Sequence, residues 1–234
     1  MKIFCVNLPR DVERRKKMEG ELEKLSIPVE FIEGVDGRKL TDEELKNVYA
    51  KWRTRFRHGK DLSRGELGCA LSHVKFYDEM IRGADEVGMV VEDDVSFGEE
   101  IFDALCEVER FLKATDDPAI VQLPGLKRDL PQGDATDMIS VKFAMGTYAY
   151  AINRAGAELL KKEFTPVKMP IDRYNYLIKH CGLKFYVYPK IVLSVDMEGE
   201  SSVGQDRFIK MNAPVMALYK AWRMMGVLID RVLS

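Results

Sequence analysis

Three consecutive carboxylates, Glu92, Asp93 and Asp94, directly follow the apolar run VGMVV at residues 87–91. An unbroken run of Val and Met predicts a strand buried on both faces, and ligands tend to bind at the end of such a strand in an open α/β sheet. Three carboxylates are costly to bury there unless a cation neutralises them, and oxygen ligands suit Mg²⁺ or Mn²⁺. The alternative is a solvated turn or an acid-rich helix N-terminus.

The elements that must position this triplet alternate between strands and helices. Apolar runs predict strands at 2–8, 29–32, 87–91, 119–123, 138–143, 147–152 and 184–188. Periodicity and capping signals predict helices at 11–25, after Thr41, and at 64–82, 99–113, 154–163, 171–181 and 207–233. Residues 51–62 and 124–137 are expected to be loops. This alternation predicts a mostly parallel sheet flanked by helices.

Length and composition suit one α/β domain with a helical extension. The chain has 234 residues, of which 46% are hydrophobic and 32% charged, so a sizeable core can form. We expect one domain at 1–206 and a helical extension at 207–234. The formal net charge of −2 gives no footprint for nucleic acid. No run reaches the ~20 apolar residues of a membrane span, and no signal peptide is recognised, which predicts a cytoplasmic protein.

The four cysteines are far apart and show no paired C-x-x-C spacing, which argues against a structural zinc site. Cys5, Cys69 and Cys106 stand in apolar surroundings. We expect them to be reduced cysteines packed in the core.

A series of sequence blocks in a fixed order carries a family resemblance. The blocks are VNLPRDVERR at 6–15, EGVDG at 33–37, LSRGELGCALSH at 62–73, VVEDDV at 90–95, GTYAYAINRAGAELL at 146–160, PID at 170–172 and a later SSV. Together they resemble glycosyltransferase family 25, the lipopolysaccharide galactosyltransferase family. The chain departs from the family pattern at Pro9 and in the basic segment 51–60.

The resemblance implies a GT-A-like fold, a UDP-sugar donor (most often UDP-galactose), Mn²⁺ or Mg²⁺, and inversion at the anomeric carbon. The acceptor would be a hydroxyl of a lipopolysaccharide or lipooligosaccharide glycan. Asp94, and secondarily Glu92, would hold the cation, and Asp93 would hold a donor hydroxyl. A cation that bridges the diphosphate stabilises the departing UDP as its negative charge grows.

Asn7, Arg10 and Arg14, which follow the first strand, are the candidates for binding the donor. They stand at the edge of the sheet where a nucleotide would sit, and Arg suits contacts with diphosphate or ribose. Asp36, in the loop after the second strand, can accept a hydrogen bond from uracil or ribose. The alternatives are a solvated helix face for the arginines, since RDVERRKK is a run of charges, and a turn residue between glycines for Asp36.

Asp172 and His73 are the candidates for catalysis. Inversion needs a carboxylate that takes the acceptor's hydroxyl proton, by analogy with the paired carboxylates of glycoside hydrolysis. Asp172 follows Pro170 near a predicted helix start, where the dipole favours its ionised form; the alternative is a helix N-cap or first-turn acid. For His73, on the helix at 64–82, roles in metal binding, phosphate binding and positioning stay open beside a purely structural one.

Two basic segments suit an anionic membrane surface. One is KWRTRFRHGK at 51–60, and the other is the predicted helix 207–233, which carries Lys210, Lys220, Arg223 and Arg231 among apolar residues. A basic amphipathic helix can lie on such a surface, which would suit a lipid-linked acceptor at the inner face of the cell membrane. The alternative for 207–233 is a terminal helix that packs on the core.

Two other functions stay open. A metal-dependent nucleotidyl or phosphoryl transferase also holds Mg²⁺ at acidic strand ends, although the chain lacks a G-x-x-x-x-G-K-[ST] phosphate loop. The second alternative is a protein that binds a sugar nucleotide or a glycan without turnover. The intact carboxylate triplet argues against it. Release of UDP from a UDP-sugar would separate a sugar transferase from both.

Overall fold

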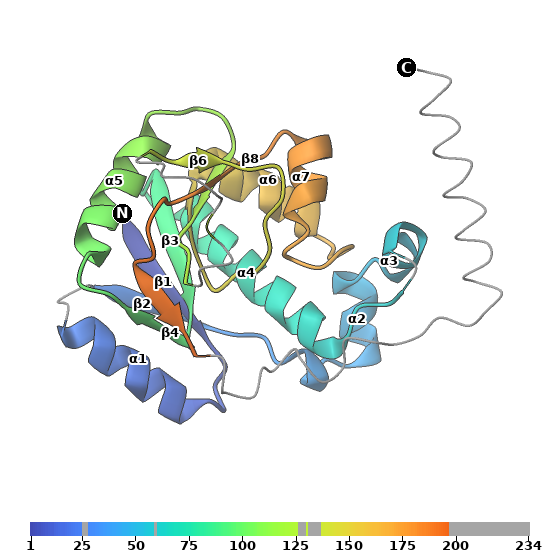
Figure 1. Ribbon diagram of the computed structural model, residues 1–234. Helices are drawn as coiled ribbons and strands as arrows, with labels where there is room; N and C mark the ends of the chain where they lie inside the picture. The colour runs from blue at the N-terminus through green and yellow to red at the C-terminus, as the bar shows by residue number, and fades with distance from the viewer. Residues whose placement is uncertain (25–27, 59, 126–129, 131–136, 197–234) are drawn as a thin grey trace, which may run out of the picture.

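The structure, a computed structural model, describes residues 1–24, 28–58, 60–125, 130 and 137–196. Within these residues a seven-stranded sheet lies at the centre of the fold, in the order β2-β1-β3-β7-β5-β8-β6 (Figure 1). Its strands are β1 (Lys2–Asn7), β2 (Val29–Glu33), β3 (Val87–Glu92), β5 (Ala119–Gln122), β6 (Ile139–Ser140), β7 (Ala149–Asn153) and β8 (Lys184–Val187).

Most strands of this sheet are parallel. Strand β7 runs antiparallel to β3 and β5, and β6 runs antiparallel to β8, whereas the other neighbours are parallel. Strands β1 and β3 are parallel neighbours with Val6 opposite Glu92, so the segments that follow them meet at one edge. The predicted α/β fold, with a mostly parallel sheet flanked by helices, is confirmed.

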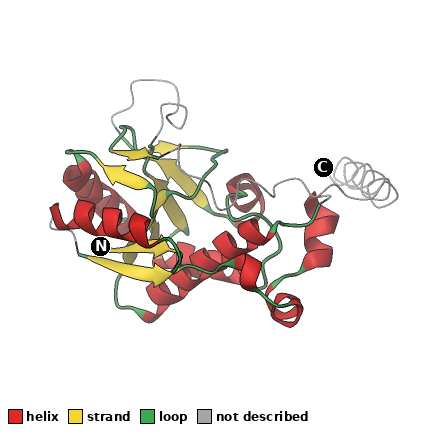
Figure 2. Cartoon of the chain, turned by 90° about the horizontal axis from the view of Figure 1, so that it is seen from below, coloured by secondary structure: helices red, strands yellow, loops and turns green. Residues whose placement is uncertain are grey.

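Helices cover both faces of the sheet (Figure 1), and Figure 2 shows the same arrangement from below. The helices are α1 (Val12–Lys24), α2 (Asp42–Val48), α3 (Lys51–His58), α4 (Arg64–Arg82), α5 (Ile101–Lys113), α6 (Arg154–Phe164) and α7 (Tyr174–Cys181). Strand residues alternate between two cores: Ile3 and Cys5 pack with α1 and α5, while Phe4 packs with α4, α6 and α7. Burial of both faces explains the apolar runs that predicted these strands.

Helix starts follow the capping signals of the sequence. Thr41 with Glu44 and Ser63 with Glu66 form the two capping boxes that open α2 and α4. Asn153 caps α6, since its Oδ1 accepts from the backbone N–H of Gly156 at 2.9 Å. The same amide also accepts from the N–H of Ala119 and donates to the carbonyl of Asp117, so it ties α6 to the start of β5.

Segment 51–62 was predicted to be a loop, and that prediction was wrong for Lys51–His58, which forms α3. Burial of one side chain and an ion pair just beyond the last turn stabilise this helix, and neither produces an apolar periodicity in the sequence. Thr54 is fully buried, and the Arg55 guanidinium donates to both oxygens of Asp61 at 2.6 and 2.8 Å.

Three smaller features also escaped the sequence prediction. Strands β4 (Val95–Phe97) and β9 (Leu193–Val195) form a separate antiparallel pair, and Gly37–Lys39 form a 3₁₀ helix, η1. Cys5 is buried as expected, but Cys106 is exposed on α5, so its assignment to the core was wrong. An apolar neighbourhood along a helix does not tell which side chain faces the core.

Several predictions fall beyond the part of the chain that the structure describes. They are the helix at 207–233, the domain boundary at 206, the SSV block and most of the loop at 124–137. Among the described residues, none of the helices combines the length and the apolar character that crossing a membrane requires.

Candidate functional site

The carboxylate triplet lies where β3 ends, at the meeting point of two cavities. Glu92 is the last residue of β3, and Asp93 and Asp94 form the turn that follows. One cavity, which we call the arginine cavity, is lined by Arg10, Arg14, Arg38 and the whole triplet. The other, the Asp172 cavity, is lined by Asp172 together with Glu92 and Asp94. Glu92 and Asp94 therefore face both spaces.

Asp94 has the properties expected of a cation ligand. Its Oδ1 is buried and has no hydrogen-bond partner among the described residues. Burial, followed by the charges of Glu92 and Asp93, raises the pKa of Asp94 to about 7. A hard divalent cation would satisfy the orphaned oxygen and offset the repulsion, so Asp94 and Glu92 fit the group that the resemblance implies.

Asp93 is held rigidly by two side chains. Asn7 donates its amide N–H to Asp93 Oδ2 at 2.6 Å, and Arg14 Nη1 donates to Oδ1 at 3.3 Å. Burial raises the pKa of Asp93, while these two partners oppose that rise. Asn7 is 4% exposed, does not line the arginine cavity, and also donates to the carbonyl of Asp11 at 3.1 Å. Asn7 thus positions Asp93, whereas Arg14 and Asp93 face the cavity.

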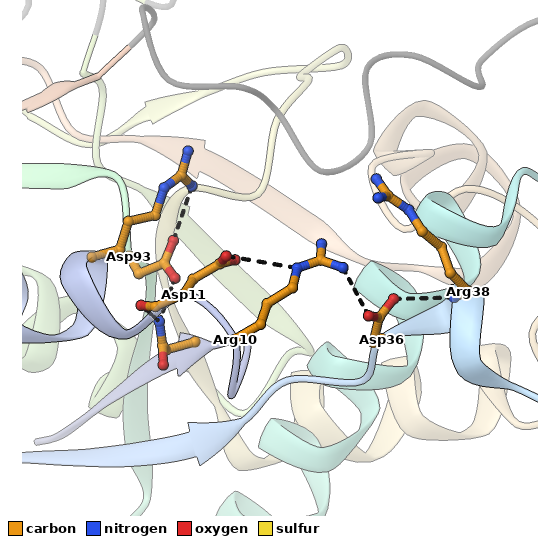
Figure 3. Close-up of polar contacts among 7 residues, drawn as sticks. Arg10, Asp11, Asp36, Arg38 and Asp93 are labelled. Atoms are coloured by element: carbon orange, nitrogen blue, oxygen red, sulfur yellow. Dashed lines mark hydrogen bonds and ion pairs between the residues drawn. The ribbon is translucent and has the colours of Figure 1, made fainter.

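Arg10, which lines the arginine cavity, lies between the carboxylates of Asp11 and Asp36 (Figure 3). Its Nη1 donates to Asp36 Oδ2 at 2.8 Å, and its Nε lies 3.6 Å from Asp11 Oδ1. Asp36 also caps η1 by accepting from the N–H of Arg38 at 3.2 Å. Asp36 is therefore a turn residue, as the alternative proposed, and it lines the cavity as well.

Two glycines bring the loop after β2 against α4. A Cβ on Gly37 would lie 1.8 Å from the carbonyl oxygen of Arg64, and a Cβ on Gly68 would lie 2.4 Å from that of Val35. Ser72 adds a hydrogen bond, since its hydroxyl accepts from the N–H of Val35 at 2.8 Å. The loop and α4 thus form part of the lining of the arginine cavity, and the segment that follows β1 forms another part.

His73 is buried and fixes Glu92. Its side chain is 1% exposed, its Nδ1 lies 2.9 Å from the hydroxyl of Tyr150, and its Nε2 lies 3.7 Å from Glu92 Oε1. The Thr147 hydroxyl donates to the same Glu92 oxygen. Burial raises the pKa of Glu92, but His73 and Thr147 outweigh it and lower the pKa overall. His73 is thus a positioning residue for a predicted ligand.

Asp172 opens on the second cavity, which has a volume of about 530 Å³. It precedes α7, whose N-cap is Arg173 and whose first turn holds no acid. The alternative explanation for Asp172, a helix N-cap or first-turn acid, was therefore wrong. Phe143, which is 65% exposed, also lines the cavity. A carboxylate, an exposed aromatic ring and the Glu92–Asp94 pair thus share one space.

Sequence reasoning missed three residues of the site. Thr147 holds Glu92, Ser72 holds the loop after β2, and Cys69 lines both cavities. All three lie inside the blocks 62–73 and 146–160 that carried the family resemblance. Their membership of those blocks was the available signal, but Thr147 and Ser72 bond to residues of other segments, and Cys69 faces cavities that several elements form, so spacing alone assigned no role.

Comparisons with known proteins agree with the resemblance. The profile of the family described as "Glycosyltransferase family 25 (LPS biosynthesis protein)" matches residues 1–175. A "Glycosyltransferase 25 family member" from Aedes aegypti is 29% identical over 182 residues, which cover 74% of this chain and 30% of the relative. "Procollagen galactosyltransferase 2" from Mus musculus is 27% identical over 222 residues, which cover 85% of this chain and 36% of the relative.

The chain spans about a third of the length of these curated relatives. Among solved structures, that of S. aureus TarS is similar with a TM-score of 0.46 and 14% sequence identity. The similarity covers 83% of this chain and 60% of the TarS chain.

Proposed function

Because the chain belongs to glycosyltransferase family 25, we propose that it transfers a hexose from a UDP-sugar to a hydroxyl of a lipopolysaccharide or lipooligosaccharide glycan, with inversion and with the help of a divalent cation. The observation that carries the proposal is the position of Glu92 and Asp94, which line both cavities. A cation held by these two carboxylates would contact a molecule bound in either cavity. The name of the mouse relative supports galactose as the transferred hexose.

In this proposal the donor lies along the arginine cavity. Arg10 and Arg14 offer guanidinium groups to a diphosphate, and Asp36 offers a carboxylate oxygen to ribose or uracil. The cavity holds about 100 Å³, which accommodates only part of a nucleotide sugar. The sugar therefore extends past the triplet toward the Asp172 cavity, and Asp93, which lines the arginine cavity, accepts from one of its hydroxyls.

Glu92 and Asp94 are the residues that would hold Mn²⁺ or Mg²⁺, which would neutralise the charge that develops on the departing diphosphate. The protein keeps these ligands in place before the donor arrives. His73 and Thr147 hold Glu92, and the backbone carbonyl of Asp94 accepts from the N–H of Asp196 at 2.8 Å. Such prepositioning lowers the reorganisation that the reaction requires.

Asp172 is the proposed general base. It faces the Asp172 cavity together with the Glu92–Asp94 pair, so an acceptor hydroxyl in that cavity reaches both. In a direct displacement the hydroxyl oxygen attacks the anomeric carbon, its proton passes to Asp172, and the bond to UDP breaks on the opposite face. One displacement inverts the anomeric centre.

We also propose that the protein works at the inner face of the cell membrane, where a lipid-linked acceptor is exposed. Trp52 on α3 is 67% exposed, and the guanidinium of Arg53 lies 5.2 Å from its ring centroid. An aromatic ring beside cations suits an anionic interface. Sedimentation with anionic vesicles tests the contact on the wild type, Trp52→Ala and a chain that ends at residue 206. Equal binding by all three would contradict a role for either segment.

Release of UDP from a panel of UDP-sugars, with and without Mn²⁺, tests the activity. We expect metal-dependent release from UDP-galactose that is lost in Asp94→Ala, and a fall in kcat for Asp172→Asn with donor binding retained. Near-normal turnover by Asp172→Asn would exclude it as the base. Donor binding without release, even when lipopolysaccharide acceptors are added, would favour a sugar-nucleotide-binding protein instead.

A further inference from the structure

A second set of metal ligands, different in chemistry from the carboxylate pair, lies beside Glu92. The thiol sulfur of Cys69, a ring nitrogen of His73 and a carboxylate oxygen of Glu92 all lie within 4.8 Å of one another. Cys69 and His73 are four residues apart on α4, which places them on one face of the helix. Glu92 meets them from the end of β3.

The geometry of His73 favours a metal ligand over a plain core residue. Its Nδ1 is engaged at 2.9 Å by the Tyr150 hydroxyl, which in turn lies 2.9 Å from the Tyr77 hydroxyl. This leaves Nε2 directed at Glu92 Oε1, 3.7 Å away. A hydrogen bond at one ring nitrogen that orients the other is the usual support for a histidine that binds a metal. Thr147 restrains the Glu92 oxygen in the same way.

Ligand chemistry selects the ion. A thiolate, an imidazole and a carboxylate are the ligands of zinc sites, whereas Mg²⁺ and Mn²⁺ prefer oxygen alone. Three protein ligands leave a fourth tetrahedral position open. Cys69 and Glu92 line both cavities, so an ion reaches this position without any element being displaced.

We propose that Cys69, His73 and Glu92 form a binding site for Zn²⁺, distinct from the hard-cation pair Glu92 and Asp94. Formation of the zinc–sulfur bond releases the thiol proton of Cys69 to solvent. Both sites need Glu92, so Zn²⁺ at this site withdraws a ligand from the hard cation. Zn²⁺ therefore inhibits sugar transfer, and this last step alone rests on the proposed function.

Metal binding to the full chain, without any nucleotide, tests the site independently of turnover. Zn²⁺ affinity is measured by competition with a chromophoric chelator, and Co²⁺ is used as a probe because its bond to a thiolate gives a charge-transfer absorption. The variants are Cys69→Ser, Asp94→Asn and, as matched control, Cys106→Ser, which changes an exposed cysteine on α5.

We expect Cys69→Ser to weaken Zn²⁺ binding at least about 10-fold, since the loss of even an outer-shell partner costs that much, and to abolish the Co²⁺ charge-transfer band. Cys106→Ser and Asp94→Asn should keep the Zn²⁺ affinity and the Co²⁺ charge-transfer band of the wild type. Failure of the wild type to bind Zn²⁺, or equal binding by Cys69→Ser and the wild type, would overturn the proposal. So would a charge-transfer band that follows Cys106.

Two further measurements keep the test decisive. If Cys69→Ser does not fold, the wild type is alkylated with iodoacetamide instead. Zn²⁺ should slow the alkylation of Cys69 and leave the alkylation rate of Cys106 unchanged. An alkylation rate of Cys69 that Zn²⁺ does not change refutes the site. In the transfer assay, Zn²⁺ should compete with Mn²⁺, and less so in Cys69→Ser. Absence of all turnover contradicts the proposed function, whereas Zn²⁺ binding is judged by the chelator assay alone.

Discussion

Gly68→Ala should destabilise the protein by closing the gap between α4 and the loop after β2. The added Cβ would lie 2.4 Å from the carbonyl oxygen of Val35 and 2.7 Å from the nitrogen of Gly37. Ordinary contact begins at 3.4 Å, so the loop must retreat by about 1.0 Å. Both obstructing atoms belong to the backbone, so no side-chain rotation relieves the clash.

The expected cost follows from two effects. Overpacking of this kind costs about 1–3 kcal/mol. Retreat of the loop also stretches the hydrogen bond from the Val35 N–H to the Ser72 hydroxyl, now 2.8 Å, which contributes about 0.5–1.5 kcal/mol. We therefore expect Gly68→Ala to lower the free energy of unfolding by about 2–4 kcal/mol.

Gly20→Ala on α1 is the matched control, because a Cβ there meets nothing within 4 Å. A helix-interior glycine costs roughly 0.5–1 kcal/mol relative to alanine, so this variant should be more stable than the wild type. Urea unfolding followed by circular dichroism compares the two. Surface substitutions typically change stability by about 0.5 kcal/mol or less. If Gly68→Ala falls within that range of the wild type, the close approach of α4 to the loop after β2 is refuted.

Three further predictions concern a helix cap, an ion pair and a candidate donor contact. Asn153→Ala should lower the free energy of unfolding by about 3–5 kcal/mol, because a cap and three other hydrogen bonds are lost together. Thr41→Ala removes one exposed cap and should cost about 1 kcal/mol, and urea titration compares the two variants. Burial raises the pKa of Asp61, but its bonds to Arg55 and nearby cations lower it overall, so its stabilisation is complete above about pH 4 and is lost as the pH falls through the folded pKa. Asp61→Asn should therefore make the melting temperature fall less steeply below about pH 4. An unchanged fall below that pH would argue against the Arg55–Asp61 ion pair. On the proposed function, Arg10→Ala should raise the KM for the UDP-sugar about 10-fold with kcat nearly unchanged, as expected for a contact made equally in the ground state and the transition state. Steady-state kinetics measures both constants, and an unchanged KM would show that Arg10 only holds the loop after β2 in place.

Local signals predicted the framework of the fold well. The capping boxes at Thr41 and Ser63 involve residues three apart, so the sequence itself contains both partners. The apolar run before Glu92 predicted β3 and, with it, the edge where the carboxylates gather. Each capping box is complete within its segment, and the burial of β3 on both faces leaves a continuous apolar run in the sequence, so pattern reasoning succeeds in these cases.

Features that depend on distant partners could not be predicted in the same way. Helix α3 begins beside Ala50, whose N–H donates to the carbonyl of Val167, and strand β4 pairs with residues 193–195, far along the chain. Asn7 was placed near the donor, yet its hydrogen bond to Asp93 spans 86 positions and makes it a positioning residue. A single sequence carries no record of such contacts, because the topology of the sheet creates them.

The two cavities are drawn from different parts of the chain. The arginine cavity uses residues up to Asp94, whereas much of the wall of the Asp172 cavity comes from 143–148 and 170–175, and Cys69, Glu92 and Asp94 are the residues shared by both. Mutations in the later segments can still reach the earlier wall through Thr147 and Tyr150, which hold Glu92 and His73. Under natural selection the rest of the later wall can diversify while these two contacts are conserved. A chimaera that takes residues 143–175 from a relative should therefore keep Thr147 and Tyr150 if the arginine cavity is to stay intact.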